Sequence, residues 1–223
     1  MTEIKAVVFD LDNTLYDAEQ YFFGAFEDIS TYMYDEYGTD SNEVFEVLLT
    51  IWKEKTSMYP DLFNDMLKYF NIYSVEEIKN IVQIFNNHEC KIKPRSDVIP
   101  TINLLRKDNI KLGIITDGTV HRQERKIKVL GLAEYFDIII YTKHIGHPKP
   151  GELSFQKAID NLGVKPCQMI YVGDNPYIDF EGAKKTGMIT ARLLKGEFSD
   201  IDTDEWIDYN IKNMYDVLYL LHT

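Results

Sequence analysis

Residues 4–15 read IKAVVFDLDNTL, and this stretch decides the fold class. Residues 6–9 form a short continuous apolar run, which is typical of a strand buried on both faces of a parallel sheet. Two carboxylates, Asp10 and Asp12, follow directly at positions i and i+2. Charges this close together after a buried strand have no evident structural purpose, so the stretch predicts a functional edge of a sheet.

The same strand pattern returns at 112–115, 138–141 and 169–172, and more weakly at 188–193. Helical patterns separate these runs, over residues 98–107, 121–130, 152–162 and 179–186. The last three stop at Gly131, Gly163 and Gly187, a residue type that commonly ends helices. Alternation of strand and helix predicts an α/β fold with a Rossmann-like, three-layer core around a parallel sheet.

Residues 16–93 contain no convincing strand and at least four helical patterns, over 18–37, 42–55, 60–70 and 74–88. Ser74 and Glu77 have the spacing of a capping box for the last helix. Pro94 marks the return to the sheet. We therefore expect an all-helical cap domain at 16–93, inserted into a catalytic core made of residues 1–15 and 94–223. Aromatic residues are dense in the insert, and at helical spacing they predict its core.

Composition narrows the possible partners and compartments. A formal net charge of -12 argues against nucleic acid or an anionic membrane surface as the main partner. The two cysteines, Cys90 and Cys167, lie far apart, which argues against a disulfide framework or a thiolate zinc site and fits a reducing compartment. Without a signal-peptide pattern or an apolar run of membrane-spanning length, we expect a cytoplasmic protein, either a monomer or a weak homodimer.

Four groups of polar residues each lie at or just beyond the end of a predicted strand. In open α/β sheets the carboxyl edge of the strands is where ligands bind. Singly these groups are weak signals, because a threonine there is often a helix cap, a Lys-Pro pair a loop and a Gly-Asp pair a turn. All four in order predict one active site. They are Asp10 with Asp12, then Thr116-Asp117-Gly118, then Lys149 between two prolines, then Gly173-Asp174 followed by Asp179.

With these residues in this order, the chain resembles the haloacid dehalogenase superfamily, whose members are mostly phosphatases on a Rossmann-like core. The run at 10–14 looks like the first motif, and Thr116, Lys149 and Gly173-Asp174 with Asp179 match the other three. The resemblance covers essentially the whole chain, because one type of cap in that superfamily is a helical insert after the first motif. It implies a phosphatase that forms an aspartyl-phosphate on Asp10, with Asp12 as general acid and base.

The resemblance also implies a Mg²⁺ cofactor, held by Asp10, Asp174 and the backbone carbonyl of Asp12. Thr116 and Lys149 would stabilise charge on the phosphoryl oxygens, with the Thr116-Asp117-Gly118 turn and Lys149 binding the substrate. Three roles are open for Asp179: holding a metal-bound water, orienting Lys149, or capping the helix that begins there.

An acid at Asp12 can activate water, so it favours rapid hydrolysis of the phosphorylated enzyme. The insert is acidic with few cations, which favours a small phosphomonoester over a substrate with several phosphates. We expect a sugar phosphate or a nucleoside monophosphate. The alternative within the superfamily is a phosphomutase that returns the phosphoryl group to a sugar. A non-catalytic binding protein on this fold is less well supported, because every matching position holds a chemically competent residue.

Overall fold

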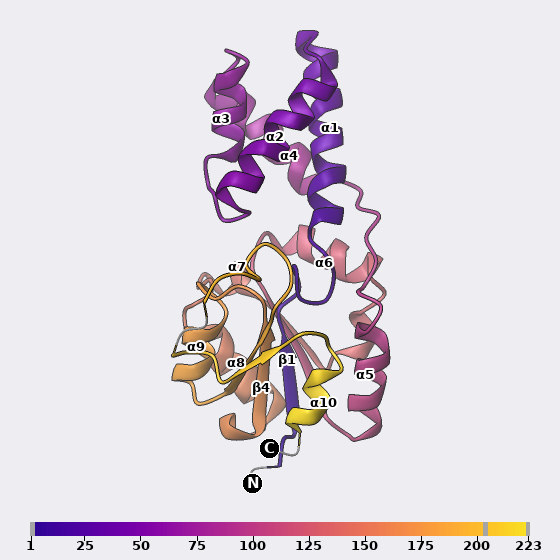
Figure 1. The fold of residues 1–223 in the computed structure, drawn as a ribbon, viewed down its shortest axis with the longest axis vertical. Helices are drawn as coiled ribbons and strands as arrows, with labels where there is room; N and C mark the ends of the chain where they lie inside the picture. Colours follow the sequence, from indigo (N-terminus) through magenta and orange to yellow (C-terminus); the bar gives the residue numbers. More distant parts are fainter. Residues whose placement is uncertain (1–2, 203–204, 222–223) are drawn as a thin grey trace. The chain divides into compact units, whose positions relative to one another are not determined.

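The computed structural model describes residues 3–202 and 205–221, so the ends of the expected core range, together with 203–204, lie outside the described residues. The chain divides into two compact units, Met1–Ala18 with Ile92–Thr223, and Glu19–Lys91 (Figure 1). Residues 16–18 and 92–93, which we expected in the insert, group with the first unit. The physical reason is visible at Tyr16, which forms isolated β-bridges with Asp12 and Pro94.

The first unit is built on a six-stranded sheet in which every neighbouring pair is parallel, with the order β3-β2-β1-β4-β5-β6. This confirms the predicted α/β class. Strand β6 was not predicted. The chain moves outward from β1 in both directions, so the switch point of the sheet lies between β1 and β4. The strands are β1 Ala6–Phe9, β2 Lys111–Thr116, β3 Ile138–Tyr141, β4 Met169–Gly173, β5 Ile189–Leu193 and β6 Tyr209–Ile211.

Helices cover both faces of this sheet. Figure 1 shows α8 and α9 on one face and α5 on the other, which gives the three layers expected. Gly163 ends α8 in the left-handed conformation, at φ 62°, where glycine carries no steric cost. The helices are α5 Val98–Lys107, α6 Val120–Val129, α7 Thr142–Ile145, α8 Leu153–Leu162, α9 Phe180–Lys185 and α10 Asp216–Leu220, with short 3₁₀ turns at Ala133–Tyr135 and Pro166–Gln168.

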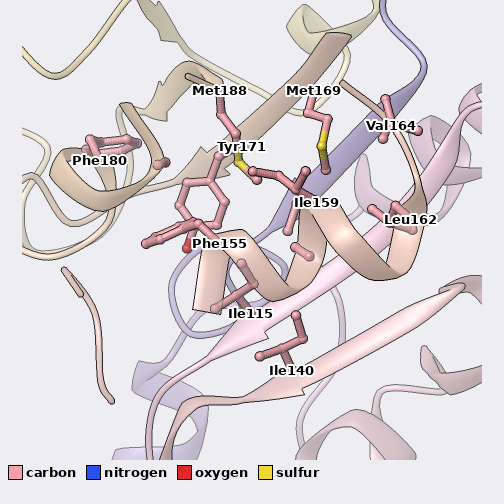
Figure 2. Close-up of a cluster of buried hydrophobic side chains, with 14 of the residues drawn as sticks. Ile115, Ile140, Phe155, Ile159, Leu162, Val164, Met169, Tyr171, Phe180 and Met188 are labelled. Atoms are coloured by element: carbon pink, nitrogen blue, oxygen red, sulfur yellow. The ribbon is translucent and has the colours of Figure 1, made fainter. Parts of the chain in front are cut away.

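A buried apolar cluster joins α8 to the sheet (Figure 2). Phe155 packs edge-on against Tyr171 of β4, with ring centroids 5.0 Å apart. Ile159 lies over the same face of the sheet, near Met169. This packing holds β4 against the helix that follows Lys149, so the core of the unit fixes two of the segments that carry predicted site residues.

Gly182 lets α9 approach the loop before α8. A Cβ at this position would overlap the carbonyl oxygen of Pro150 and lie 2.7 Å from the ring of Phe155. We therefore expect Gly182→Ala to lower the free energy of unfolding by about 1–3 kcal/mol, because a backbone shift must relieve the overlap. Urea denaturation measures this. The control is Lys185→Ala on the same helix, whose exposed side chain should change stability by less than about 0.5 kcal/mol. Equal stabilities for the two variants would contradict the prediction.

The second unit contains α1 Glu19–Tyr37, α2 Ser41–Lys55, α3 Leu62–Tyr69 and α4 Val75–Asn87. Ser74 caps α4 as predicted, accepting from the Glu77 backbone nitrogen at 3.1 Å, whereas the Glu77 carboxylate accepts from Tyr32 and Asn80. The expectation that the dense aromatics form a core is confirmed for the buried Tyr21, Phe26, Trp52 and Phe85. Within the described part of either unit, no helix is both long and apolar enough to cross a bilayer.

Candidate active site

The four predicted groups meet at the carboxyl edge of the sheet, around its switch point. Asp10 directly follows β1 and Asp174 directly follows the neighbouring β4, in a register that pairs Phe9 with Val172. The Asp10 backbone nitrogen donates to the Val172 carbonyl at 2.8 Å, so the pairing of the two strands extends to Asp10 itself. Thr116 ends β2, on the other side of β1.

Lys149 lies at the centre of this edge. Its Nζ donates to Asp10 Oδ1 at 2.5 Å and to Asp179 Oδ1 at 2.6 Å, and its side chain is 2% exposed. Burial lowers the pKa of Lys149, but the charges of Asp10 and Asp179 outweigh burial and raise it well above its usual value. A permanent ammonium group is therefore held between two carboxylates.

The Tyr171 hydroxyl completes the surroundings of Lys149. It accepts from Lys149 Nζ at 3.2 Å and donates to Asp179 Oδ1 at 3.1 Å. Burial, followed by the Asp179 charge, raises the pKa of Tyr171 well above its usual value, so the hydroxyl keeps its proton. The Tyr171 ring belongs to the apolar cluster of Figure 2, and its packing there holds the hydroxyl in place.

Asp179 connects Lys149 to the loop after β4. Its Oδ2 accepts from the backbone nitrogens of Asp174 at 3.2 Å and Asn175 at 2.9 Å. Although Asp179 occupies the N-cap position of α9, its side chain makes no capping hydrogen bond. A Cβ on Gly173 would lie only 2.5 Å from Asp179 Oδ2, so glycine is needed for this close approach. Of the three roles considered for Asp179, the contacts match an orienting role for Lys149.

Asp174, which follows β4, is almost fully buried. Its Oδ1 accepts from the Thr14 hydroxyl at 3.3 Å, while the buried Oδ2 has no hydrogen-bond partner among the described residues. Burial, with the charges of Asp179 and Asp10, raises the pKa of Asp174 well above its usual value. A buried oxygen without a hydrogen-bond partner destabilises the fold unless another group, such as a cation, interacts with it.

Three carboxylates converge here against one ammonium group. Oxygens of Asp10, Asp174 and Asp179 lie within 4.8 Å of one another. Burial is the main cause that raises the pKa of Asp10, to about 8, with Lys149 opposing the rise and Asp179 adding to it. A hard cation bound by these oxygens would favour the ionised forms and satisfy Asp174 Oδ2. Both Asp179 oxygens already accept hydrogen bonds, so Asp10 and Asp174 are the better direct ligands.

The Asp12 side chain turns to a different set of partners from those of Asp10. Its Oδ1 accepts from Lys126 Nζ at 2.5 Å and from the Tyr16 hydroxyl, and its Oδ2 accepts from Gln123 Nε2 at 2.7 Å. Burial would raise the pKa of Asp12, but Lys126 and the hydrogen bonds from all three partners lower it to about 2. Asp12 is thus ionised at rest, and both of its carboxylate oxygens already accept hydrogen bonds.

The three residues of the predicted phosphate-binding turn differ in their contacts. Thr116 is buried, and its Oγ1 accepts from Gln123 Nε2 at 2.6 Å. The Asp117 carboxylate is engaged by the Thr142 hydroxyl and by the backbone nitrogen of Lys149 at 3.3 Å, so it supports the Lys149 loop instead of facing a substrate. Gly118 has φ 111°, a conformation that favours glycine.

Sequence reasoning did not single out several side chains that contact the predicted set, among them Tyr16, Gln123, Lys126, Thr142 and Tyr171. Tyr171 belongs to a predicted buried strand, and Gln123 and Lys126 belong to the helix predicted over 121–130, but neither pattern singled out these side chains. The only available signal was the i, i+3 spacing of Gln123 and Lys126, which places both on one face of the helix. The amino-acid pattern does not show that this face of the helix is buried. In the structure both residues are buried.

The chain is similar to known proteins both in sequence and in structure. The family model described as haloacid dehalogenase-like hydrolase matches residues 7–193. The chain is 33% identical to the glyceraldehyde 3-phosphate phosphatase of Methanocaldococcus jannaschii over 96% of both chains. It is 30% identical to the pyrophosphatase PpaX of Halalkalibacterium halodurans, covering 97% of this chain and 96% of that one. A crystal structure of a phosphatase from Thermococcus onnurineus superimposes with a TM-score of 0.70, at 28% identity and 98% coverage of each chain.

Proposed function

The chain belongs to the haloacid dehalogenase-like hydrolase family and is a phosphatase of small phosphate compounds, and from this premise we propose that it hydrolyses a phosphomonoester through an aspartyl-phosphate on Asp10. The resemblance drawn from the four motifs is thereby confirmed at the level of the family. The observation that carries the finer proposal is the cluster of Asp10, Lys149, Asp174 and Asp179 at the switch point, with one buried Asp174 oxygen unpartnered.

In the first step, a carboxylate oxygen of Asp10 attacks the phosphorus of the ester, and the bond from phosphorus to the leaving oxygen breaks. Lys149 donates a hydrogen bond to Asp10 Oδ1, so the position of the nucleophile is fixed before the substrate binds. The leaving alkoxide takes a proton from Asp12 and departs as an alcohol. Because its environment lowers its pKa to about 2, Asp12 must first take up this proton, from solvent or from the monoanionic ester as the substrate binds, and it then gives the proton up readily.

In the second step, water attacks the phosphorus of the aspartyl-phosphate and passes a proton to Asp12, and the bond from phosphorus to Asp10 breaks. Inorganic phosphate leaves and the Asp10 carboxylate is regenerated. Asp12 is ionised at this stage because it gave its proton to the leaving group, and its lowered pKa lets it pass the new proton on to solvent afterwards. Lys149 and the Thr116 hydroxyl supply positive charge and a hydrogen bond for the equatorial oxygens in both steps.

The donor set fits Mg²⁺, which prefers oxygen ligands and keeps some of its waters. Asp10 and Asp174 would hold the ion, together with the backbone carbonyl of Asp12. When bound, Mg²⁺ supplies positive charge against the phosphoryl oxygens and keeps Asp10 ionised beside the other carboxylates. The unpartnered Asp174 Oδ2 and the raised pKa of Asp10 both support this assignment.

For the substrate we propose a small sugar phosphate, with a triose phosphate as the first compound to test. The support is the 33% identity to a relative named for glyceraldehyde 3-phosphate. A second candidate is pyrophosphate, since a relative at 30% identity is named as a pyrophosphatase. Nucleoside monophosphates stay in the panel, because the acidic chain favours a substrate with few charges.

The test is phosphate release from glyceraldehyde 3-phosphate, other sugar phosphates, nucleoside monophosphates, p-nitrophenyl phosphate and pyrophosphate, with Mg²⁺ or with EDTA. We expect Mg²⁺-dependent release, fastest with a sugar phosphate, and loss of at least about 100-fold in EDTA. Release that EDTA leaves unchanged would contradict the metal assignment. No release from any ester would contradict the phosphatase mechanism, and phosphoryl transfer between sugars without net release would favour the phosphomutase.

A further inference from the structure

The Asp12 carboxylate accepts hydrogen bonds from three side chains. Lys126 and Tyr16 share its Oδ1, and Gln123 bonds its Oδ2. A carboxylate has about four acceptor positions, so three donors leave one open. That position is on Oδ2. The carboxylate is therefore anchored through one oxygen and presents a single lone pair of the other.

The anchoring groups are built into the fold. Lys126 and Gln123 lie on one face of α6 and are 3% and 0% exposed, and Tyr16 is fully buried. The ammonium group of Lys126 also lies 5.7 Å from the centre of the Tyr16 ring. Ordering a long lysine side chain inside a protein costs conformational entropy and desolvation. Lys126 forms an ion pair with Asp12 Oδ1, so its placement serves that carboxylate.

Gln123 connects two parts of the site. The same amide nitrogen donates to Asp12 Oδ2 and, at 2.6 Å, to the Thr116 hydroxyl oxygen. Because Thr116 Oγ1 accepts from Gln123, its own proton is directed away from that amide. In the structure the hydroxyl donates to the Asp117 carbonyl oxygen at 3.4 Å, a long hydrogen bond that a phosphoryl oxygen could replace in the role expected of Thr116.

We propose that Lys126, Tyr16 and Gln123 are positioning residues that anchor Asp12 through Oδ1, leave one lone pair of Oδ2 for proton exchange, and orient the Thr116 hydroxyl. The inference rests on the proposed function of Asp12 and goes beyond it, because it assigns roles to three residues outside the four motifs. General acid–base catalysis depends on placement, and a displacement of about 1 Å can cost roughly 100-fold.

The experiment compares two esters that differ in their need for a proton. Nitrophenolate leaves without protonation, whereas the alkoxide of an alkyl ester needs a proton from Asp12. The constant kcat/KM covers the steps up to departure of the leaving group, so it isolates this half of the reaction. For Lys126→Met, we expect the ratio of kcat/KM for the best alkyl phosphate to that for p-nitrophenyl phosphate to fall roughly tenfold or more. Lys126→Arg keeps a cationic donor and should recover part of the ratio.

Two further variants keep the test decisive. Lys128→Met makes the same change at an exposed position of α6 and should leave the ratio at the wild-type value. Tyr16→Phe removes a single oxygen, so it carries the test if Lys126→Met fails to fold, and its ratio should also fall. An unchanged ratio, an equal loss for both esters, or a rise for the alkyl ester would overturn the positioning role. Wild-type enzyme inactive on every ester would instead count against the proposed function.

Discussion

Replacing Asp10 by asparagine is expected to reduce phosphate release from every ester by about 10⁴-fold or more. An amide has nearly the same shape as a carboxylate, and its oxygen can still accept from Lys149. It cannot act as the anionic nucleophile, so no aspartyl-phosphate forms. The measurement is kcat for the preferred ester at saturating Mg²⁺. The matched control is Asp160→Asn, the same exchange at an exposed position of α8. Activity of Asp10→Asn within tenfold of wild type would rule out Asp10 as nucleophile.

The same variant has a pH-dependent stability with a defined sign. Burial raises the pKa of Asp10 from 3.8 to about 8. A carboxyl group with a raised folded pKa stabilises the fold below its unfolded pKa, and this contribution is lost as pH rises through the folded pKa. Asparagine cannot ionise. In EDTA, Asp10→Asn should therefore match wild type near pH 4 and become the more stable protein toward pH 8. Thermal unfolding across this range also shows that an inactive variant is folded.

The location of the site could be predicted from the sequence because two rules act together. The apolar runs of buried strands can be recognised in the amino-acid sequence, and parallel strands bring their carboxyl ends to one edge of the sheet. Asp10, Thr116 and Asp174 each follow such a run, so their meeting is a consequence of topology. Strand β6 escaped prediction because its three residues, Tyr209–Ile211, include an exposed tyrosine and asparagine, and only Ile211 is buried.

The direction of each side chain was beyond prediction for a physical reason. The i, i+2 spacing of Asp10 and Asp12 places both at the sheet edge, but their orientations depend on partners distant in sequence. Lys126 lies 114 positions from Asp12, and Lys149 lies 139 positions from Asp10. The buried residues of helix α6 are Gln123, Lys126 and Ile127, so its buried face carries only one apolar residue and no apolar stripe that could have been recognised. Asp117 shows the converse: it was predicted to bind the substrate, but its carboxylate accepts from the backbone nitrogen of Lys149 and supports that loop.

Lys149→Met should give the second large effect, and it should affect both catalysis and folding. Removal of the ammonium group leaves Asp10 and Asp179 buried without the cation that each contacts. Loss of one group that stabilises transition-state charge costs about 10²–10³-fold in kcat. Breaking a buried ion pair by removing one partner typically destabilises a fold by about 3–5 kcal/mol.

The pH dependence of this variant distinguishes charge from packing. Methionine fills similar space, so a pure packing defect would be constant with pH. A charge defect should be smallest in acid, where the carboxyl groups of Asp10 and Asp174 are protonated, and should grow as they ionise toward neutral pH, because their folded pKa values are raised. Urea unfolding in EDTA at several pH values measures the difference, with Lys157→Met on the exposed side of α8 as the control. A defect independent of pH would mean that Lys149 stabilises the site by shape, and a kcat near wild type would exclude it from the reaction. Because Lys149 contacts both Asp10, the proposed nucleophile, and Asp179, the charge explanation predicts that the catalytic loss and the pH-dependent instability appear together in one variant.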